Sequence, residues 1–333
     1  MTEIVPAEQV SAAPLELGRL AAARYGFGAD ARLHLFPLTE NWTFRVEEGG
    51  GPAPVVLRIY RPNGKSLDEI RSELGWIGAL TADGFPVPPV VPTLDGADVF
   101  PLVLDSRQSP LYCCAFEAVP GTEPAPDELP TWFPRLGELT ARLHRHARSW
   151  RRPDWFTRPR WDFHTTLGER PHWGRWEASV PDPEEQRQLR RLDEVVRARL
   201  ARFGEGPARF GLIHADLRLA NLIVEGERLA VVDFDDCGES WFLYDLAATL
   251  TFNEGRPDVD ELIDAWVGAY RRLEPLSRED EAEIRTFLML RRLLISAYVG
   301  IRPDTELARE LREAGYSTES CVLAERYLSR YTA

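Results

Sequence analysis

The chain lacks several features that mark common protein classes. Only one of its 40 basic residues is a lysine, Lys65, and the net charge is −13. General nucleic-acid binding needs a basic surface that neutralises phosphates, so this charge argues against it. No apolar run approaches the roughly 18 residues of a membrane span, and the first residues lack the pattern of a secretory signal. The four cysteines have no paired metal-ligand spacing, so we expect reduced thiols in a cytoplasmic protein.

The residues that carry chemistry gather in one stretch, 210–236. It contains His214, Asp216 and Asn221, and it ends in an acidic cluster that begins at Asp233. The order His-x-Asp-x-x-x-x-Asn, then a short hairpin and an Asp, is the arrangement that kinases use for phosphoryl transfer. There, a carboxylate accepts the proton of the attacking hydroxyl, and two further oxygen ligands hold Mg²⁺ against the phosphates of ATP. A single Asp or Asn beside a strand is more often a turn or capping residue, but four such residues at these spacings favour catalysis.

The middle of this stretch predicts a β-hairpin. Two short runs rich in β-branched residues, 222–224 and 229–232, flank a turn that contains glycine. If the hairpin is centred on residue 227, Asn221 lies opposite Asp233. Side chains paired in this way have Cβ atoms roughly 4.5–5.5 Å apart, close enough to share one hard cation through oxygen. A slip of one residue would turn one of these ligands to the other face.

The first third of the chain predicts a small antiparallel sheet. Residues 1–30 contain Ala-rich helical stretches without visible chemistry. Five strands are expected after them, at residues 33–38, 43–46, 55–60, 99–104 and 111–118. A stiff, proline-rich connection at 85–92 is expected to be extended.

The third strand and the helix that follows it carry a candidate ion pair. Alternation places Arg58 and Tyr60 on one face of the strand. The helix opens with a capping box at Ser66 to Glu69 and carries Glu73 beside its apolar stripe. Because an unpaired buried charge costs several kcal/mol, Glu73 needs a partner, and Arg58 is the candidate. Kinases use a strand lysine and a helix glutamate in this way to position the nucleotide phosphates. Here an arginine would replace the lysine; the alternative is two unrelated surface charges.

Two other segments are candidates for nucleotide contacts by position. Residues 39–44, with Asn41, lie where a kinase carries its phosphate-covering loop, although the Gly-x-Gly-x-x-Gly pattern is missing. Phe116, Glu117 and Val119 belong to the expected hinge between two lobes, where backbone groups would bind adenine.

Beyond the hinge the pattern is mainly helical. His144 and His146 are interpreted as helix-end or surface residues rather than metal ligands. Five tryptophans between Trp150 and Trp176 indicate a packed, irregular cap over a domain or, alternatively, a lid that binds the acceptor. Asp245 lies among apolar residues in the first turn of a later helix, so its carboxylate needs backbone or basic partners. We expect the catalytic loop to supply them.

With these residues in hand, the chain resembles the aminoglycoside phosphotransferase and choline kinase superfamily, from about Glu40 to about Val299. Parts of the chain are similar to type II homoserine kinases and to a bacterial stress-response Ser/Thr kinase of this superfamily. The segments that carry the resemblance are Glu40-Asn41, Leu57-Arg58-Ile-Tyr-Arg61-Pro62, Glu73, His214 to Asn221, Val232 to Asp236 and Tyr244-Asp245-Leu-Ala.

The resemblance implies an α+β, protein-kinase-like bilobal fold. After an N-terminal helical segment at 1–30, residues 31–118 would form a nucleotide-binding lobe with a five-stranded antiparallel sheet and one main helix. Residues 119–333 would form a larger, mostly helical lobe for catalysis and acceptor binding.

The resemblance also implies roles for the residues above. Asp216 would be the catalytic base, and Asn221 and Asp233 would hold Mg²⁺. Arg58 with Glu73 would set the phosphates of ATP. By the same resemblance, the Asp in the Tyr-Asp-Leu-Ala segment would brace the catalytic loop.

The predicted activity is an ATP- and Mg²⁺-dependent transfer of a phosphoryl group to a hydroxyl of a small molecule, such as an aminoglycoside, homoserine or a choline-like compound. The acidic net charge is compatible with a cationic acceptor. Protein Ser/Thr is the alternative acceptor. Two further alternatives are a non-catalytic pseudokinase, against which Asp216, Asn221 and Asp233 argue, and a metallohydrolase built on His214, which would need further metal ligands. Neither nucleic acid nor a membrane is an expected partner.

Overall fold

The computed structural model describes residues 12–37, 40–61, 64–102 and 110–331. Contacts divide the chain into two compact units. Unit 1 consists of Met1–Pro124, Arg151–Arg158 and Ala220–Asp235, and unit 2 consists of Ala125–Trp150, Pro159–Leu219 and Asp236–Ala333. The predicted assignment of nucleotide binding and acceptor binding to separate lobes stays a prediction.

Unit 1 is built on an antiparallel sheet, which has six strands in the described part of the chain. Its strands are β1 (Arg32–Leu35), β2 (Trp42–Glu47), β3 (Val55–Ile59), β4 (Val90–Val91), β5 (Phe100–Leu102) and β6 (Leu111–Glu117). The order is β1-β2-β3-β6-β4, and β5 also pairs with β6. Unit 1 also holds helix α1 (Ala12–Ala23), helix α2 (Leu67–Ala82) and a hairpin of β8 (Leu222–Glu225) and β9 (Arg228–Val231).

The predicted count of five strands is wrong, because the proline-rich connection contributes one more. This connection is extended, as expected, and Val90 and Val91 in it pair with β6. These two residues carry backbone N–H groups between prolines, which is enough for a very short edge strand. Leu38, and residues 103 and 104, which belong to predicted strands, lie outside the described residues, as does Pro62.

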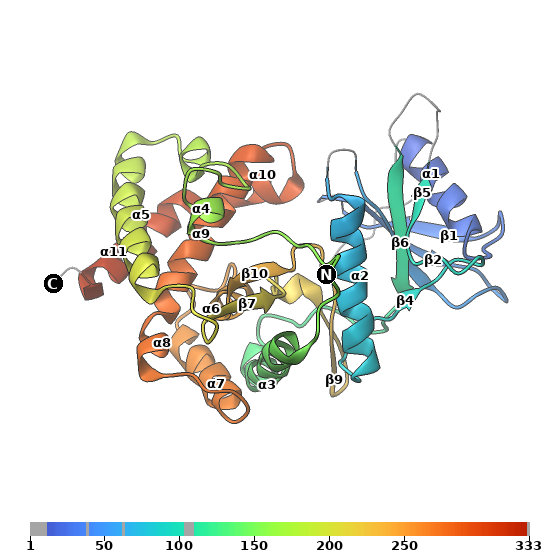
Figure 1. The fold of residues 1–333 in the computed structure, drawn as a ribbon. Helices are drawn as coiled ribbons and strands as arrows, with labels where there is room; N and C mark the ends of the chain where they lie inside the picture. Colours follow the sequence, from blue (N-terminus) through green and yellow to red (C-terminus); the bar gives the residue numbers. More distant parts are fainter. Residues whose placement is uncertain (1–11, 38–39, 62–63, 103–109, 332–333) are drawn as a thin grey trace. The chain divides into compact units, whose positions relative to one another are not determined.

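The two faces of the sheet have different partners, and α1 and α2 cover opposite faces (Figure 1). One face forms a core with α1, in which Leu17, Ala21, Val55, Leu57 and Ile59 are buried. Arg58 points to the other face, where it contacts Glu73 of α2. The predicted alternation in β3 is therefore confirmed.

Helix α2 begins and ends where its sequence signals lie. Ser66 Oγ accepts a hydrogen bond from the Glu69 N–H at 3.3 Å, and the Glu69 carboxylate accepts one from the Ser66 N–H at 2.8 Å. This capping box satisfies two N–H groups at the helix start. The helix ends before Gly84, whose φ of +68° suits glycine. Glu73 then falls on the buried face of the helix.

The hairpin has a different register from the predicted one. Glu225 pairs with Arg228, and the residue before Asp233 donates its N–H to the carbonyl of Asn221 at 2.9 Å. Asn221 therefore does not lie opposite Asp233, and the prediction is wrong by one residue. The reason is the turn, which has two residues and begins at Gly226 with a φ of +57°, whereas the predicted centre requires three.

Unit 2 is mainly helical. Helices α5, α9 and α11 pack together, and α3 lies beside α7 (Figure 1). The elements are α3 (Leu129–Ser149), α4 (Phe163–Thr166), η2 (Trp176–Ser179), α5 (Pro183–Phe203), β7 (Phe210–Ile213), β10 (Gly238–Trp241), α6 (Leu243–Thr249), α7 (Val259–Arg271), α8 (Arg278–Ala282), α9 (Ile284–Ile301), α10 (Glu306–Glu313) and α11 (Tyr316–Tyr331). The short turn η3 (Leu219–Asn221) carries the chain from unit 2 into unit 1.

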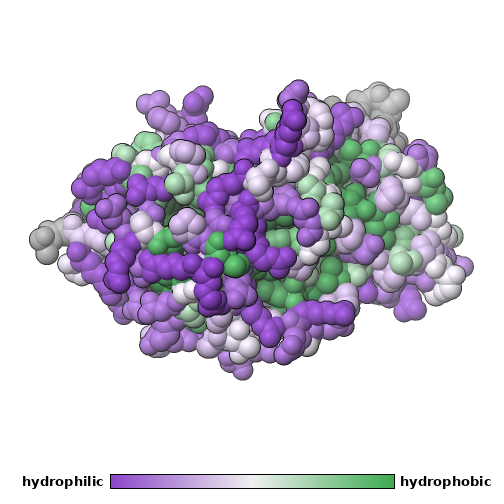
Figure 2. Space-filling view, turned by 60° about the horizontal axis from the view of Figure 1, so that its bottom comes forward, coloured by the Kyte–Doolittle hydropathy of each residue, from purple (hydrophilic) through white to green (hydrophobic). Residues whose placement is uncertain are grey.

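The surface is predominantly hydrophilic on the face drawn in Figure 2, with hydrophobic residues visible in smaller areas. In the described part of the chain, no helix is both long and apolar enough to cross a membrane. All four cysteines are buried free thiols. Among the described residues, the large hydrophobic side chains that are exposed come from separate segments, which is ordinary for a folded protein: Leu20, Leu94, Trp155, Phe252, Ile301 and Val322.

Candidate active site

In unit 1, the guanidinium of Arg58 joins two carboxylates. Its Nη1 donates to Glu73 Oε1 at 2.6 Å, and its Nη2 donates to Asp233 Oδ1 at 2.7 Å. Glu73 is fully buried, whereas the Asp233 side chain is 43% exposed. The expected pair of Arg58 with Glu73 is present, and the structure adds Asp233 to it. A planar fork can address two carboxylates from separate nitrogens, which suits arginine better than lysine.

Aromatic groups surround this fork. The Tyr60 hydroxyl donates to Glu73 Oε2 at 3.0 Å, and the guanidinium lies over the Phe116 ring with its carbon 5.1 Å from the ring centroid. Burial alone would lower the pKa of Arg58, but Glu73 and Asp233 outweigh it and hold that pKa well above its usual range. Arg58 is therefore a fixed positive charge, and Phe116 supports it from β6.

At the end of β6, two backbone groups stay outside the hydrogen bonds of the sheet: the Glu117 carbonyl and the Val119 N–H. The Glu117 N–H donates to the Pro89 carbonyl at 2.9 Å, and the Ala118 N–H donates to the Pro54 carbonyl at 3.1 Å. An antiparallel pair would return a bond to the Glu117 carbonyl from residue 89, but proline has no N–H. The Val119 N–H makes no hydrogen bond to the described residues. One acceptor and one donor thus remain where adenine binding is predicted.

A third carboxylate near Arg58, that of Asp235, has one oxygen without a hydrogen-bond partner among the described residues. Asn41 Nδ2 donates to Asp235 Oδ2 at 2.8 Å, while Asp235 Oδ1 is buried without a partner among the described residues. Burial alone would raise the pKa of Asp235, but Lys65, Arg58 and Arg158 lower it overall. A buried, ionised oxygen without a partner is costly unless a cation reaches it. The predicted contact of Asn41 with the nucleotide stays a prediction.

The predicted metal ligands lie in the same unit. Asn221 is buried, and Asp233 has a φ of 65°, a left-handed conformation that costs about 1–3 kcal/mol in a residue other than glycine. Such conformations concentrate at functional sites. Among the described residues, no group of three or more His, Cys, Asp or Glu side chains is placed to hold a metal. Asn221 and Asp233 carry oxygen donors, and ATP-dependent enzymes hold Mg²⁺ through one or two such side chains plus phosphate oxygens. The assignment of these two residues to a metal stays a prediction.

In unit 2, Asp216 lies between two arginines. Its Oδ1 contacts Arg291 Nη2, and its Oδ2 accepts from Arg218 Nε at 3.2 Å. Burial alone would raise the pKa of Asp216, but Arg218 and Arg291 lower it below its usual value. The carboxylate is therefore ionised at neutral pH, the state that a proton acceptor requires.

The Arg291 side chain is buried inside α9. It donates from Nη1 to the Tyr244 hydroxyl at 3.0 Å and from Nε to Thr251 Oγ1 at 3.1 Å, and its guanidinium carbon lies 5.7 Å from the Trp173 ring centroid. No sequence motif points to Arg291, which lies in a mostly apolar stretch of the chain, residues 287–299. The signal was available, since an arginine inside an apolar helix needs a buried anion.

Asp245 supports the backbone of the loop that carries Asp216, as predicted. Its carboxylate accepts from the N–H groups of His214 and Ala215 at 3.2 and 2.8 Å. Ala215 has a φ of 69°, which is unfavourable for alanine. These two hydrogen bonds hold that strained residue immediately before Asp216.

His144 completes this support, and the interpretation of it as a helix-end or surface residue is wrong. It is fully buried in α3, which continues to Ser149, so His144 does not stand at the helix end. Burial lowers the pKa of His144. The neutral ring then donates from Nε2 to Asp245 at 3.0 Å and accepts at Nδ1 from the Tyr270 hydroxyl at 2.9 Å, with the tautomer assigned from these contacts.

The tryptophan-rich stretch divides between the two units. Residues 151–158, with Trp155, belong to unit 1, and the chain from Pro159 onward belongs to unit 2. In unit 2, Trp173 packs edge-to-face on Trp161 and Tyr298, with centroid distances of 5.2 and 5.6 Å. Because Trp173 also contacts Arg291, this aromatic group lies beside the partner of Asp216. The acceptor-lid interpretation stays a prediction.

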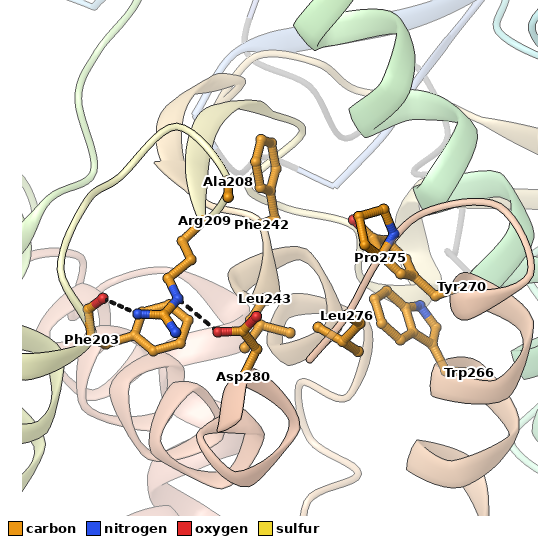
Figure 3. Close-up of a pocket in the computed structure, with 10 residues that line it drawn as sticks. All are labelled: Phe203, Ala208, Arg209, Phe242, Leu243, Trp266, Tyr270, Pro275, Leu276 and Asp280. Carbon is orange, nitrogen blue, oxygen red and sulfur yellow. Dashed lines mark hydrogen bonds and ion pairs between the residues drawn. The ribbon is translucent and has the colours of Figure 1, made fainter. Parts of the chain in front are cut away.

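A small pocket in unit 2 includes Tyr270, the partner of His144, in its lining. Its cavity volume is about 20 Å³, enough for one water and far too small for a nucleotide. No residue that the sequence predicted for the site lines it (Figure 3). The lining residues are Phe203, Ala208, Arg209, Phe242, Leu243, Trp266, Tyr270, Pro275, Leu276 and Asp280.

Comparison with known proteins identifies the family. Residues 36–285 match the model of APH, the phosphotransferase enzyme family. The chain belongs to this family. The matched region contains Arg58, Glu73, Asp216 and Asp233. The predicted relation to the aminoglycoside phosphotransferase and choline kinase superfamily, and the predicted class of enzyme, are confirmed.

Individual proteins that the chain is similar to are also named as kinases. A solved microcompartment-associated aminopropanol kinase is 38% identical, covers 95% of this chain and 98% of its own, and has a TM-score of 0.85. The amicoumacin kinase hAmiN, solved with AMP-PNP, Ca²⁺ and Ami, is 22% identical, covers 92% of each chain and has a TM-score of 0.75. The amicoumacin kinase of Bacillus subtilis (strain 168) is 28% identical over 69% of this chain, which spans 65% of that relative. The predicted α+β, kinase-like fold is confirmed.

Proposed function

We propose that this APH-family chain transfers the γ-phosphoryl group of ATP to a hydroxyl of a small molecule, with an amino alcohol as the acceptor. The proposed binding of ATP rests on one observation, the Arg58 guanidinium held by Glu73 and Asp233. The amino alcohol is supported by the relative of 38% identity that is named an aminopropanol kinase. The net charge of −13 favours the approach of a cationic acceptor.

The nucleotide would be held by unit 1. The Glu117 carbonyl and the Val119 N–H would bind the adenine edge through the two groups that the sheet leaves open. Arg58, kept in place by Glu73, would offset charge on the phosphates, as the strand lysine does in kinases.

Asn221 and Asp233 would hold a divalent cation, which we take to be Mg²⁺. The unpartnered oxygen of Asp235, two residues after Asp233, supports a cation in this part of unit 1. A cation bound there would neutralise charge on the nucleotide phosphates. The hAmiN structure is a complex with AMP-PNP and Ca²⁺, which supports the use of a divalent ion together with a nucleotide.

Asp216 would orient the acceptor hydroxyl and accept its proton. The hydroxyl oxygen forms a bond to the γ-phosphorus, the bond from that phosphorus to the bridging oxygen breaks, and ADP leaves. Because its two arginines lower the pKa of Asp216, it is ready to accept a hydrogen bond at neutral pH. A positioned base of this kind typically contributes about 10²–10⁴-fold.

ADP release across a panel of amino alcohols, aminoglycosides, sugars and a generic protein tests the proposal, with Asp216→Asn as the blank. We expect release with at least one amino alcohol, and loss of release but retention of AMP-PNP binding in Asp216→Asn. Phosphorylation of the generic protein substrate, without release of ADP on any small molecule, would overturn the proposal of a small-molecule acceptor. AMP-PNP binding without turnover on any acceptor would identify a pseudokinase, and metal-dependent phosphatase activity without nucleotide would identify a hydrolase.

A further inference from the structure

Residues 151–158 form a strap on unit 1, although the chain on both sides of them belongs to unit 2. The strap contains neither helix nor strand. Irregular segments keep a fixed path only where their backbone and side chains find partners. This strap contacts helix α2 and the segment from Asp233 to Asp235.

The strap contacts α2 at three positions on one helical face. Its Thr157 N–H donates to Ser72 Oγ at 2.8 Å. Trp155 lies against Gly75, where a Cβ would approach the ring at 3.0 Å. The third contact is a hydrogen bond of 2.9 Å from Arg158 to the carbonyl of Glu69. Helix positions 69, 72 and 75 recur every three residues and therefore share a face.

Arg158 also reaches the segment that carries Asp233. Its Nη1 donates to α2, and its Nη2 donates to the carbonyls of Phe234, at 3.5 Å, and of Asp235. The same helix and segment meet a second time where the Trp76 and Phe234 rings pack edge-to-face with centroids 5.3 Å apart. One guanidinium therefore ties α2 to the segment through separate nitrogens.

These two elements supply the two carboxylates of the Arg58 fork. Glu73 comes from α2 and Asp233 from the segment, and Arg58 contacts them at 2.6 and 2.7 Å. The fork closes on both only if the helix and the segment keep their separation. We infer that Arg158 is a positioning residue that sets this separation and thereby the nucleotide affinity of unit 1. The inference rests on the proposed binding of ATP phosphates at Arg58.

Arg158→Ala, with Arg151→Ala as the matched control, is the first test. Arg151 belongs to the same strap, and its side chain is exposed. We expect the KM for ATP to rise on the order of tenfold in Arg158→Ala, the effect of losing about one hydrogen bond to a charged group, and to change less than about twofold in Arg151→Ala. Arg158→Lys, which keeps the charge without the fork, should recover only part of the affinity. A folded Arg158→Ala protein with an unchanged KM would overturn the inference.

A second pair of variants keeps the inference testable if Arg158→Ala fails to fold. Ser72 and Thr81 each donate a hydrogen bond to the carbonyl four residues earlier in α2, at 2.7 and 2.9 Å. Only Ser72 also accepts from the strap. Ser72→Ala should speed amide hydrogen exchange in α2 and raise the KM for ATP, on the order of threefold for one neutral hydrogen bond. Thr81→Ala should do neither.

Amide exchange separates failure of this inference from failure of the proposed function. If the wild-type protein binds AMP-PNP and Ser72→Ala matches Thr81→Ala in both exchange and KM, the strap does not position α2, and the inference is wrong. If the wild-type protein binds no nucleotide, the proposed function is wrong. Faster amide exchange in α2 of Ser72→Ala would then still support the claim that the strap positions α2, but it would not support a link between this positioning and nucleotide affinity.

Discussion

Replacing Arg58 by methionine tests whether the fork is the electrostatic centre of unit 1. Methionine keeps an unbranched chain but removes the charge that Glu73 and Asp233 contact. Glu73 is 0% exposed, so the variant leaves a buried carboxylate without its cation. Loss of one partner from a buried ion pair costs about 3–5 kcal/mol. Asp233 adds little to this cost because its side chain is 43% exposed and water can replace the guanidinium.

The assay is urea unfolding followed by far-UV circular dichroism, with linear extrapolation to water. We expect Arg58→Met to lower the free energy of unfolding by about 3–5 kcal/mol. The double variant Arg58→Met/Glu73→Leu should regain most of that loss, because replacing a buried ion pair by apolar groups is often neutral or stabilising. Neither variant should bind AMP-PNP.

A surface pair in the same unit is the control. Arg24 contacts Asp95 at 2.7 Å, but these side chains are 46% and 63% exposed. Arg24→Met should therefore cost only about 0–1 kcal/mol. If Arg58→Met cost no more than Arg24→Met, or if the double variant recovered nothing, Glu73 would not be a buried anion that depends on Arg58, and the reasoning would fail.

Three further predictions follow from unit 2 and from α2. Arg291→Met should move the acid limb of the kcat/KM profile to higher pH, because burial then raises the pKa of Asp216 with less opposition. In the wild-type protein, the stability that the lowered pKa of Asp216 contributes is present above the unfolded-state value of about 3.9 and is lost as the pH falls through the folded value. In Arg291→Met the folded value lies higher, so Asp216 should contribute less stability at neutral pH, and acid unfolding should show a smaller loss over this range. His144→Phe should lower both kcat and the Tm while leaving the KM for ATP unchanged. It removes one charge-assisted hydrogen bond to Asp245, which supports the loop that carries Asp216, and such a bond is worth about 1.5–3 kcal/mol. An unchanged kcat would contradict that role. Gly78→Ala should raise the free energy of unfolding by about 0.5–1 kcal/mol, since a Cβ at this position meets no atom within 4 Å. Gly75→Ala should raise it less, since a Cβ there meets Trp155 of the strap at 3.0 Å. Equal gains in Tm would argue against that contact.

Local signals made much of unit 1 predictable from the sequence. The capping box at Ser66 and the glycine after Ala82 set the limits of α2, and β-strand alternation put Arg58 on the face toward Glu73. Asp245 was predictable for the same kind of reason, since a carboxylate among apolar neighbours must find donors. For α2 and β3, residues near in sequence decided the outcome, whereas the Asp245 donors lie 30 and 31 residues away and its apolar neighbours indicated only that it needs donors.

Contacts between distant segments were not predictable in this way. Arg158 lies 89 residues from its partner Glu69, and Arg291 lies 75 residues from Asp216. A sequence read locally shows that a buried arginine needs an anion but not which anion it meets. The predicted hairpin register was wrong for a local reason: the turn has two residues rather than three, which changes the residue that lies opposite Asn221.

The central claim is that Asp216 serves phosphoryl transfer to a hydroxyl while Arg58, Asn221 and Asp233 serve the nucleotide. The most direct measurement is ³¹P NMR of a reaction that contains ATP, Mg²⁺ and an active amino alcohol from the panel. The account predicts that a phosphomonoester of the acceptor appears together with ADP for the wild-type protein and not for Asp216→Asn, which still binds AMP-PNP. Ester formation at the wild-type rate by Asp216→Asn, or release of inorganic phosphate in place of the ester, would contradict it.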